Sequence, residues 1–242
     1  MQDSNTIRTA LVLAGGKGER LRPLTDDRPK PMVPVGDRPL IEYHLRWLAS
    51  NGVRRAILLV GYKQEVIRQH FAVERVPGLT VECVGEDRPL GRGGAIRNGF
   101  EVADVHDELI IATNGDVVSE QPIADMLALH RETNALVTVL LTRMVSPFGV
   151  VEVDDAQMIT SFREKPVLSF WINGGAYVLS REALLRFPRE GDHETLLFPD
   201  LARSGRIAGF KSEAYWKSVE SAKDLRELAD RTLSSQPSTP QR

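Results

Sequence analysis

Three glycines, Gly15, Gly16 and Gly18, follow the first apolar run of the sequence. Because they carry no side chain, their backbone can approach a ligand closely and offer N–H donors to phosphate oxygens. The cations that follow in the same segment are Arg20, Arg22, Arg28 and Lys30. The combination favours binding of a polyphosphate, and the alternative is a tight turn surrounded by solvated charges. The spacing matches neither G-x-x-x-x-G-K-S/T nor G-x-G-x-x-G.

A second candidate group follows another apolar run. Asp116 comes after Asn114 and Gly115, directly behind the run 108–113. If this run is a strand of a parallel sheet, its carboxyl end lies at the ligand-binding edge. Mg2+ is commonly held by one or two carboxylates together with phosphate oxygens. Asp116 is therefore our first candidate metal ligand, and ordinary turn chemistry is the alternative.

The composition narrows the class of protein. The chain has 242 residues, of which 42% are hydrophobic, so it is long enough to bury a core. A net charge of -2 argues against nucleic acid or an anionic membrane as a partner, because both need a surplus of Lys and Arg. Cys83 is the single cysteine, which excludes an internal disulfide and a cysteine-based metal site. The first apolar run is too short for a signal peptide or membrane span, so we expect a cytoplasmic protein.

Strand and helix patterns alternate along the first two thirds of the chain. This order predicts a Rossmann-like α/β fold with three layers, α/β/α, around a mixed, mainly parallel central sheet. Continuous apolar runs, typical of strands buried on both faces, predict strands at 9–14, 55–60, 80–84, 108–113 and 135–141. Helical spacing predicts helices at 38–52, 63–71, 94–102, 123–132, 181–186 and 195–203.

Six motifs together carry a resemblance to a family. "LAGGKGERLRPLT" followed by "RPKPMVPV" resembles the signature of the sugar-1-phosphate nucleotidyltransferases, or NDP-sugar pyrophosphorylases. The segments "EDRPLGRGGAI", "NGD", "FGVVEVDD", "REKP" and "INGGAYV" follow in the family's order. The resemblance covers residues 9–225. It implies that a nucleoside triphosphate and a sugar 1-phosphate react to give an NDP-sugar and pyrophosphate, with Mg2+ as cofactor.

The resemblance also implies how the chain is divided. It implies one nucleotidyltransferase domain over 1–233, with a nucleotide half at about 8–145 and a sugar-phosphate half at about 146–220. Short strands within 148–155, 158–166 and 173–179 are expected to extend the sheet and close a pocket. Ser221 and Asp224 form an S-x-x-D box, which predicts a C-terminal helix at about 221–233. A polar flexible tail is expected at 234–242, with no appended domain.

The nucleotide side is implied residue by residue. Arg20 matches the arginine that clamps the triphosphate, and Lys30 the lysine near the reacting centre, so these are the implied catalytic cations. Arg92 replaces the family's usual threonine and is either a phosphate contact or a solvated residue at a helix start. The nucleotide-binding positions implied by the resemblance are Leu13, Ala14, Gly15, Gly16, Gly18, Glu86, Pro89 and Gly91.

The sugar side is implied in the same way. Glu164 would accept the sugar hydroxyls and Lys165 would meet the phosphate, the alternative being a surface turn. Trp171 and Tyr215 serve either in packing or in stacking on the sugar. The implied sugar-phosphate-binding positions are Gly149, Glu164, Lys165, Asn173 and Gly174.

The chain departs from the family at a metal ligand. Ser218 stands where the family carries a second metal-binding aspartate. In an extended segment Glu220 shares a face with Ser218, so our hypothesis is that Glu220 replaces the missing acid beside Asp116. The alternative is that Glu220 is a first-turn helix charge and that Asp116 is the only carboxylate on the metal.

The substrate choice depends on Glu86. A carboxylate can accept two hydrogen bonds from guanine, whereas uracil and thymine present one N–H between two carbonyls. We therefore expect GTP and an enzyme similar to the mannose-1-phosphate guanylyltransferases. The alternatives are glucose-1-phosphate thymidylyl- or uridylyltransferase, heptose-1-phosphate guanylyltransferase, MurNAc-1-phosphate uridylyltransferase and a non-catalytic regulatory subunit that binds nucleotide-sugars. Assembly into a homo-oligomer is left open by the sequence.

Overall fold

The computed structural model describes residues 6–234. Its elements alternate as the sequence predicts, and strand β4 has the predicted bounds. The strands are β1 (Thr9–Leu13), β2 (Pro34–Val35), β3 (Arg38–Pro39), β4 (Arg55–Val60), β5 (Thr80–Gly85), β6 (Leu109–Asn114), β7 (Val117–Ser119), β8 (Val137–Val145), β9 (Val150–Val153), β10 (Ile159–Arg163), β11 (Val167–Ser180), β12 (Ile207–Lys211) and β13 (Trp216–Ser218).

The helices also follow the predicted order. The helix predicted at 38–52 stops before Gly52, which has a positive φ of 90° that glycine adopts readily. The helices are α1 (Leu40–Ser50), α2 (Gln64–Val73), α3 (Gly91–Val102), α4 (Ile123–Thr133), α5 (Arg181–Arg186), α6 (His193–Leu196), α7 (Phe198–Arg203) and α8 (Ala222–Ser234).

A seven-stranded sheet forms the centre of the molecule, in the order β12-β8-β11-β6-β1-β4-β5. The pairs β6–β1, β1–β4, β4–β5 and β12–β8 are parallel. Strand β11 runs antiparallel to both of its neighbours, β6 and β8. The predicted mixed, mainly parallel sheet is therefore confirmed.

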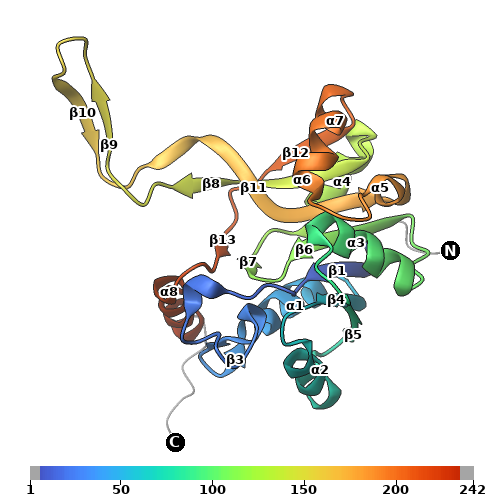
Figure 1. Ribbon diagram of the computed structural model, residues 1–242. Helices are drawn as coiled ribbons and strands as arrows, with labels where there is room; N and C mark the ends of the chain where they lie inside the picture. The colour runs from blue at the N-terminus through green and yellow to red at the C-terminus, as the bar shows by residue number, and fades with distance from the viewer. Residues whose placement is uncertain (1–5, 235–242) are drawn as a thin grey trace, which may run out of the picture.

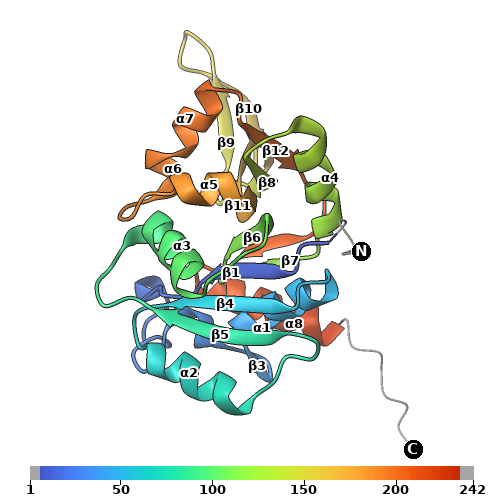
Figure 2. The same ribbon diagram turned by 90° about the vertical axis from the view of Figure 1, so that its right-hand side faces the viewer.

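Helices cover both faces of this sheet (Figure 2). Helices α1, α2 and α4 pack on one face, where Leu45 and Ile67 meet Val12 and Leu58. Helices α3 and α5 pack on the other face, where Ile96 contacts the cluster that contains Leu11. Because successive strand residues point to opposite faces, β1 must be apolar throughout to be covered on both sides. The three-layer α/β/α architecture follows from this pattern.

The hairpin of β9 and β10 forms its own two-stranded sheet and projects from the body (Figure 1). Glu152 and Arg163 pair across one of its faces at 3.3 Å. The side chains of Phe148, Ile159 and Phe162 are exposed. The expectation that these short strands close a pocket does not match this arrangement, because the hairpin extends away from the layers.

Helix α8 returns the chain to the N-terminal segment, against which it lies in Figure 1. Val219, just before the helix, and Leu228 within it are buried against Leu21 and Val33. The predicted capping box is present, since Asp224 Oδ2 accepts a hydrogen bond from the Ser221 N–H at 2.8 Å. Ser234 belongs to the helix rather than to the expected tail, and 235–242 lie outside the described residues.

Three elements differ in extent from the predictions. The strand expected at 173–179 is the second half of the longer β11, which begins at Val167. The helix expected at 195–203 is broken into α6 and α7 at Leu197, whose φ of -121° is not helical. Helix α3 begins at Gly91, earlier than the predicted residue 94. Strands β7 and β12 were not predicted from the sequence.

His193 is a buried histidine whose protonation opposes folding. Its ring stacks on Phe187 and meets the edge of Tyr177, and neither ring nitrogen has a hydrogen-bond partner. The Glu194 carboxylate lies 3.5 Å from Nδ1 without forming a hydrogen bond. Burial lowers the pKa of His193 from 6.5 to about 4. The folded protein therefore holds this ring neutral down to about pH 4.

We predict that acid weakens folding partly through His193. Between pH 6.5 and about pH 4 the unfolded chain binds a proton there that the folded chain does not, so stability falls as the pH drops through this window. His193→Phe should reduce the loss of unfolding free energy between pH 7 and pH 5, measured by urea denaturation. His44 and His130 have pKa values shifted in the same direction, so part of the loss will remain. His106→Phe, at an exposed position, is the control, and an equal pH dependence in wild type and His193→Phe would contradict the assignment.

Candidate active site

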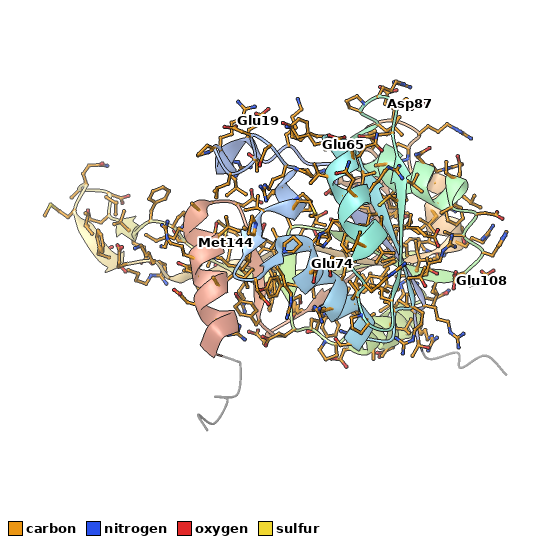
Figure 3. The ribbon with its side chains drawn as sticks, turned by 90° about the horizontal axis from the view of Figure 1, so that it is seen from below. Glu19, Glu65, Glu74, Asp87, Glu108 and Met144 are labelled. Carbon is orange, nitrogen blue, oxygen red and sulfur yellow. The ribbon has the colours of Figure 1, made fainter. Side chains whose placement is uncertain are left out.

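A cavity of about 450 Å3 opens at the carboxyl ends of the parallel strands. The segments that follow β1, β4 and β5 lie along this edge of the molecule, as Glu19, Glu65 and Asp87 show in Figure 3. Glu108, which precedes β6, lies away from that edge in the same view. The cavity lies where open α/β sheets bind their ligands. Its lining residues are Leu13, Gly15, Gly16, Lys30, Pro31, Leu59, Glu86, Pro89, Gly91, Arg92, Ala95, Asn114, Asp116, Asp192, Ser218 and Glu220.

The glycine loop forms one wall of the cavity. Gly16 is exposed, and a Cβ atom there would meet nothing within 4 Å. Gly18 differs, because its φ is +66° and a Cβ atom would lie 2.7 Å from Lys30 Cβ. The Lys30 N–H donates to the Gly16 carbonyl at 3.3 Å. Gly16 is thus an open backbone position at the cavity, while Gly18 is required for the fit of the loop against Lys30.

Lys30 lies between two carboxylates on the cavity floor. Its Nζ is 2.6 Å from Asp116 Oδ2 and 3.2 Å from Glu220 Oε1. Lys30 is 8% exposed, and burial of its ammonium group would be unfavourable without these two carboxylates. The rigid "PKP" segment is buried as a short 3₁₀ turn, which excludes the solvated-lysine alternative. The structure therefore brings the two candidate metal ligands onto one cation.

The position of Glu220 follows from backbone contacts. Strand β13 pairs with β7, so that Ser218 lies opposite Val117, and the Val219 N–H donates to the Asp116 carbonyl at 3.1 Å. The Ser218 hydroxyl donates to Glu220 Oε1 at 2.9 Å. Arg20 reaches the same carboxylate at 3.4 Å from a largely exposed position and does not line the cavity.

His44 supports the turn that carries Asp116, a role for which the sequence contained no motif. Its Nδ1–H donates to the Val117 carbonyl at 2.8 Å, and its Nε2 accepts from the Thr113 hydroxyl at 2.7 Å. Complete burial lowers the pKa of His44 to about 4, so the ring stays neutral and keeps one donor and one acceptor. The turn between β6 and β7 is thereby fixed from behind.

The segment expected to contact the base also lines the cavity. Glu86, Pro89 and Gly91 all contribute to the wall. Glu86 Oε2 accepts a hydrogen bond from the Leu90 N–H at 3.0 Å, so the carboxylate also shapes its own loop. A carboxylate has about four lone-pair positions, which leaves acceptors for a ligand. Glu86 is half-buried at the cavity wall.

Two polar residues of the cavity wall were not predicted from the sequence. Asn114 Oδ1 is buried without a hydrogen-bond partner, and its position directly before Gly115 and Asp116 was a usable signal. Asp192 comes from the distant second half of the chain and has no motif around it. Its carboxylate pairs with Arg92 at 3.0 Å, and the Arg92 side chain is 49% exposed in the first turn of α3, which agrees with the alternative of a solvated residue at a helix start.

The residues expected on the sugar side do not line this cavity. Glu164 and Lys165 lie at the base of the β9–β10 hairpin, exposed and 3.7 Å apart. Gly149 packs against Phe162 and Glu164. On β11, the Asn173 Nδ2 donates to the Tyr177 hydroxyl at 2.8 Å, and the Gly174 carbonyl accepts from Trp216 Nε1 at 2.8 Å.

Two further nucleotide positions also lie outside the lining. Ala14 is buried, and Gly18 is not among the residues that line the cavity.

The two aromatic residues expected near the sugar, Trp171 and Tyr215, each have a guanidinium over the ring. The Arg143 guanidinium is 4.1 Å from the Trp171 ring centre, and that of Arg231 is 3.8 Å from the Tyr215 ring centre. Both rings therefore take part in intramolecular packing in this structure.

None of the helices within residues 6–234 is both long and apolar enough to span a bilayer. Within the same range, no three or more His, Cys, Asp or Glu side chains gather as a metal-binding group. Asp116 and Glu220 are the two candidate carboxylates beside Lys30.

Comparison with known proteins identifies the family. The model of the nucleotidyl transferase family matches residues 9–235, and the chain belongs to this family. A mannose-1-phosphate guanylyltransferase of Mycobacterium tuberculosis is 37% identical over 224 residues, which are 89% of this chain and 62% of that protein. A mannose-1-phosphate guanyltransferase of Schizosaccharomyces pombe is 34% identical over 89% of this chain and 61% of its own length. The chain thus spans about three fifths of the length of these relatives.

Solved structures show the same fold. HddC from Yersinia pseudotuberculosis superimposes with a TM-score of 0.75 at 25% identity, covering 93% of this chain and 100% of that chain. A UDP-glucose pyrophosphorylase complexed with UDP-glucose gives a TM-score of 0.73 at 19% identity, covering 96% of this chain and 100% of its own. The fold predicted from the order of strands and helices is that of nucleotide-diphospho-sugar transferases.

Two glycine substitutions should separate ligand contact from loop geometry. Gly18→Ala should lower the unfolding free energy by about 1–2 kcal/mol, because alanine is strained at positive φ and its Cβ clashes with Lys30. If this loop binds phosphate, Gly16→Ala should leave stability unchanged but weaken GTP binding by about tenfold, because the added Cβ holds a phosphate away from the backbone and roughly one hydrogen bond is lost. Urea denaturation and titration calorimetry measure the two effects. Unchanged GTP affinity in Gly16→Ala would remove this loop from the nucleotide site.

Proposed function

We propose that the protein transfers a guanylyl group from GTP to mannose 1-phosphate, giving GDP-mannose and pyrophosphate. The observation that carries the proposal is the position of Lys30, held by Asp116 and Glu220 in a cavity that the glycine loop and the segment with Glu86 also line. This arrangement offers a cation and open backbone to phosphates and a carboxylate to a base. The names of the relatives from M. tuberculosis and S. pombe support the choice of substrates.

The reaction is a single displacement. An oxygen of the sugar phosphate attacks the α-phosphorus of GTP, the α–β phosphoanhydride bond breaks, and its electron pair leaves with pyrophosphate. The nucleophile is already an anion near neutral pH, so no general base is needed. The task of the protein is to hold two polyanions in line and to balance charge on the α-phosphoryl group. We assign that task to Lys30 and Arg20.

The charge balance of the site supports a need for Mg2+. Lys30 and Arg20 bring two positive charges, which Asp116 and Glu220 already offset. Carboxylates that converge on one cation fit Mg2+, which is usually bound by one or two carboxylates together with substrate phosphates. We propose that Asp116 and Glu220 hold the ion. When bound, Mg2+ would neutralise phosphate oxygens and help pyrophosphate to leave.

The base and the sugar are assigned to different parts of the chain. We propose that Glu86 accepts hydrogen bonds from guanine, with Pro89 and Gly91 beside the base, within a nucleotide half at 8–145. The sugar phosphate is assigned to Gly149, Glu164, Lys165, Asn173 and Gly174, within a half at 146–220. Because those residues lie outside the described cavity, this assignment rests on their motifs.

A substrate matrix tests the proposal. Pyrophosphate release is measured with GTP, dTTP, UTP, ATP or CTP against mannose, glucose, heptose and MurNAc 1-phosphates, and GTP with mannose 1-phosphate should give the highest kcat/KM. Lys30→Met should lower that value by about 100-fold or more, and Lys30→Arg should retain part of it. Lys223→Met, on the exposed face of α8, is the control. Tight nucleotide-sugar binding without turnover of any pair would instead indicate a regulatory subunit.

A metal titration tests Glu220. Glu220→Gln should raise the Mg2+ concentration for half-maximal activity by about tenfold or more, because a charged ligand becomes neutral. It should also weaken Mn2+ binding, followed by electron paramagnetic resonance. Glu227→Gln is the matched control, because Glu227 is a carboxylate of the following helix α8 that pairs with Lys217 of β13 and does not line the cavity. If Glu220→Gln requires no more Mg2+ than wild type, Asp116 is the only carboxylate on the metal.

A further inference from the structure

The segment from Pro188 to Glu194 is pressed onto the loop assigned to the base. The Gly191 N–H donates to the Leu90 carbonyl at 2.7 Å, and the Gly191 carbonyl accepts from the Gly93 N–H at 2.9 Å. A Cβ atom on Gly91 would lie 2.8 Å from the Gly191 backbone. Glycine therefore faces glycine where the two segments cross. This close backbone contact fixes the next residue, Asp192, at the cavity wall.

The Asp192 carboxylate is oriented by Arg92. Its Oδ1 accepts from the Arg92 backbone N–H at 2.9 Å, and its Oδ2 accepts from Arg92 Nη2 at 3.0 Å. These hydrogen bonds lower the pKa of Asp192 and raise that of Arg92. The side chain of Asp192 is 38% exposed, on the side of the cavity. A charged carboxylate accepts hydrogen bonds and donates none, and two of its lone-pair positions remain open to a ligand.

Arg92 is already held by two carboxylates. Its Nη1 is 2.9 Å from Glu194 Oε1, so the guanidinium lies between Asp192 and Glu194. Arg92, Asp192 and Glu194 together carry a net charge of one negative unit. Such a group favours neutral donors such as hydroxyls over a phosphate.

The ribose is the part of the nucleotide that reaches this wall. If the base lies at Glu86 and the phosphates lie at Gly16 and Lys30, as the proposed function has it, the ribose must join them across the cavity. Asp192 extends from the segment that packs on the base loop. The residues assigned to the sugar 1-phosphate lie elsewhere.

We propose that Asp192, positioned by Arg92, accepts hydrogen bonds from the ribose hydroxyls and selects ribonucleotides over 2′-deoxyribonucleotides. A ribose offers two donors, at the 2′ and 3′ positions, to the two oxygens of one carboxylate. A deoxyribose offers only the 3′ donor and leaves one desolvated carboxylate oxygen without a hydrogen bond. The free-energy cost of that unpaired oxygen exceeds the net gain from a single hydrogen bond. The inference rests on the proposed function and adds a specificity-determining residue to it.

Binding of GTP and dGTP tests the inference apart from turnover. By titration calorimetry, wild type should bind GTP about tenfold or more tightly than dGTP. Asp192→Ala should lose affinity for GTP and little for dGTP, so that the ratio approaches one. Asp192→Asn preserves the shape if the alanine variant folds poorly, and it should lower the ratio as well. Arg92→Thr should lower the ratio while the preference for GTP over UTP is retained.

Glu190→Ala is the matched control. Glu190 lies two residues before Asp192 in the same segment and pairs with Arg88 at 2.7 Å, but it does not line the cavity. Its ratio of GTP to dGTP affinity should equal that of wild type. Equal affinities for GTP and dGTP in wild type would overturn the inference and leave guanylyl transfer intact. The inference would also be overturned if Asp192→Asn changed the choice of sugar 1-phosphate but not the ratio of GTP to dGTP affinity. Absence of any nucleotide binding in wild type would overturn the proposed function and the inference together.

Discussion

The buried ammonium of Lys30 is the interaction on which the site depends. An ammonium that is 8% exposed would be unstable without partners, and Asp116 and Glu220 provide them at 2.6 and 3.2 Å. These three side chains come from a 3₁₀ turn after β1, from the end of β6 and from the approach to α8. Three parts of the chain that are remote in sequence therefore meet where these charges pair. All three residues line the cavity at the carboxyl edge of the sheet.

The cations of this site are paired with carboxylates. Arg20 and Lys30 lie against Asp116 and Glu220, and Arg92 lies between Asp192 and Glu194. Among the residues that line the cavity, two cations stand against four carboxylates, so the lining carries a net negative charge before any ligand enters. The paired groups are already oriented when a ligand arrives, and they lose little freedom on binding.

The sequence predicted those features that depend on local pattern. The continuous apolar runs located β1 and β4 because both strands are buried on two faces, while β12 was missed because Gly209 and Lys211 break its apolar pattern. The glycine loop, Lys30 and Asp116 were found because they lie in motifs at strand ends. Asp192 and His44 were not found, because their roles arise from packing. Asp192 lies in the segment that packs on Gly91, and His44 contacts the turn after β6. The proposal that Glu220 replaces the missing acid depends on both kinds of information. The spacing of Ser218 and Glu220 came from the sequence, and the pairing of β13 with β7 came from the structure.

The docking of α8 has a consequence for how the protein is made. Val219 and Leu228 are buried against Leu21 and Val33, and Glu220, directly after Val219, contacts Lys30. During synthesis the strands β1, β4, β5 and β6 leave the ribosome well before residue 220. Until then one of the two carboxylates beside Lys30 is missing. The environment of Lys30 is therefore completed only when this late segment of the chain docks.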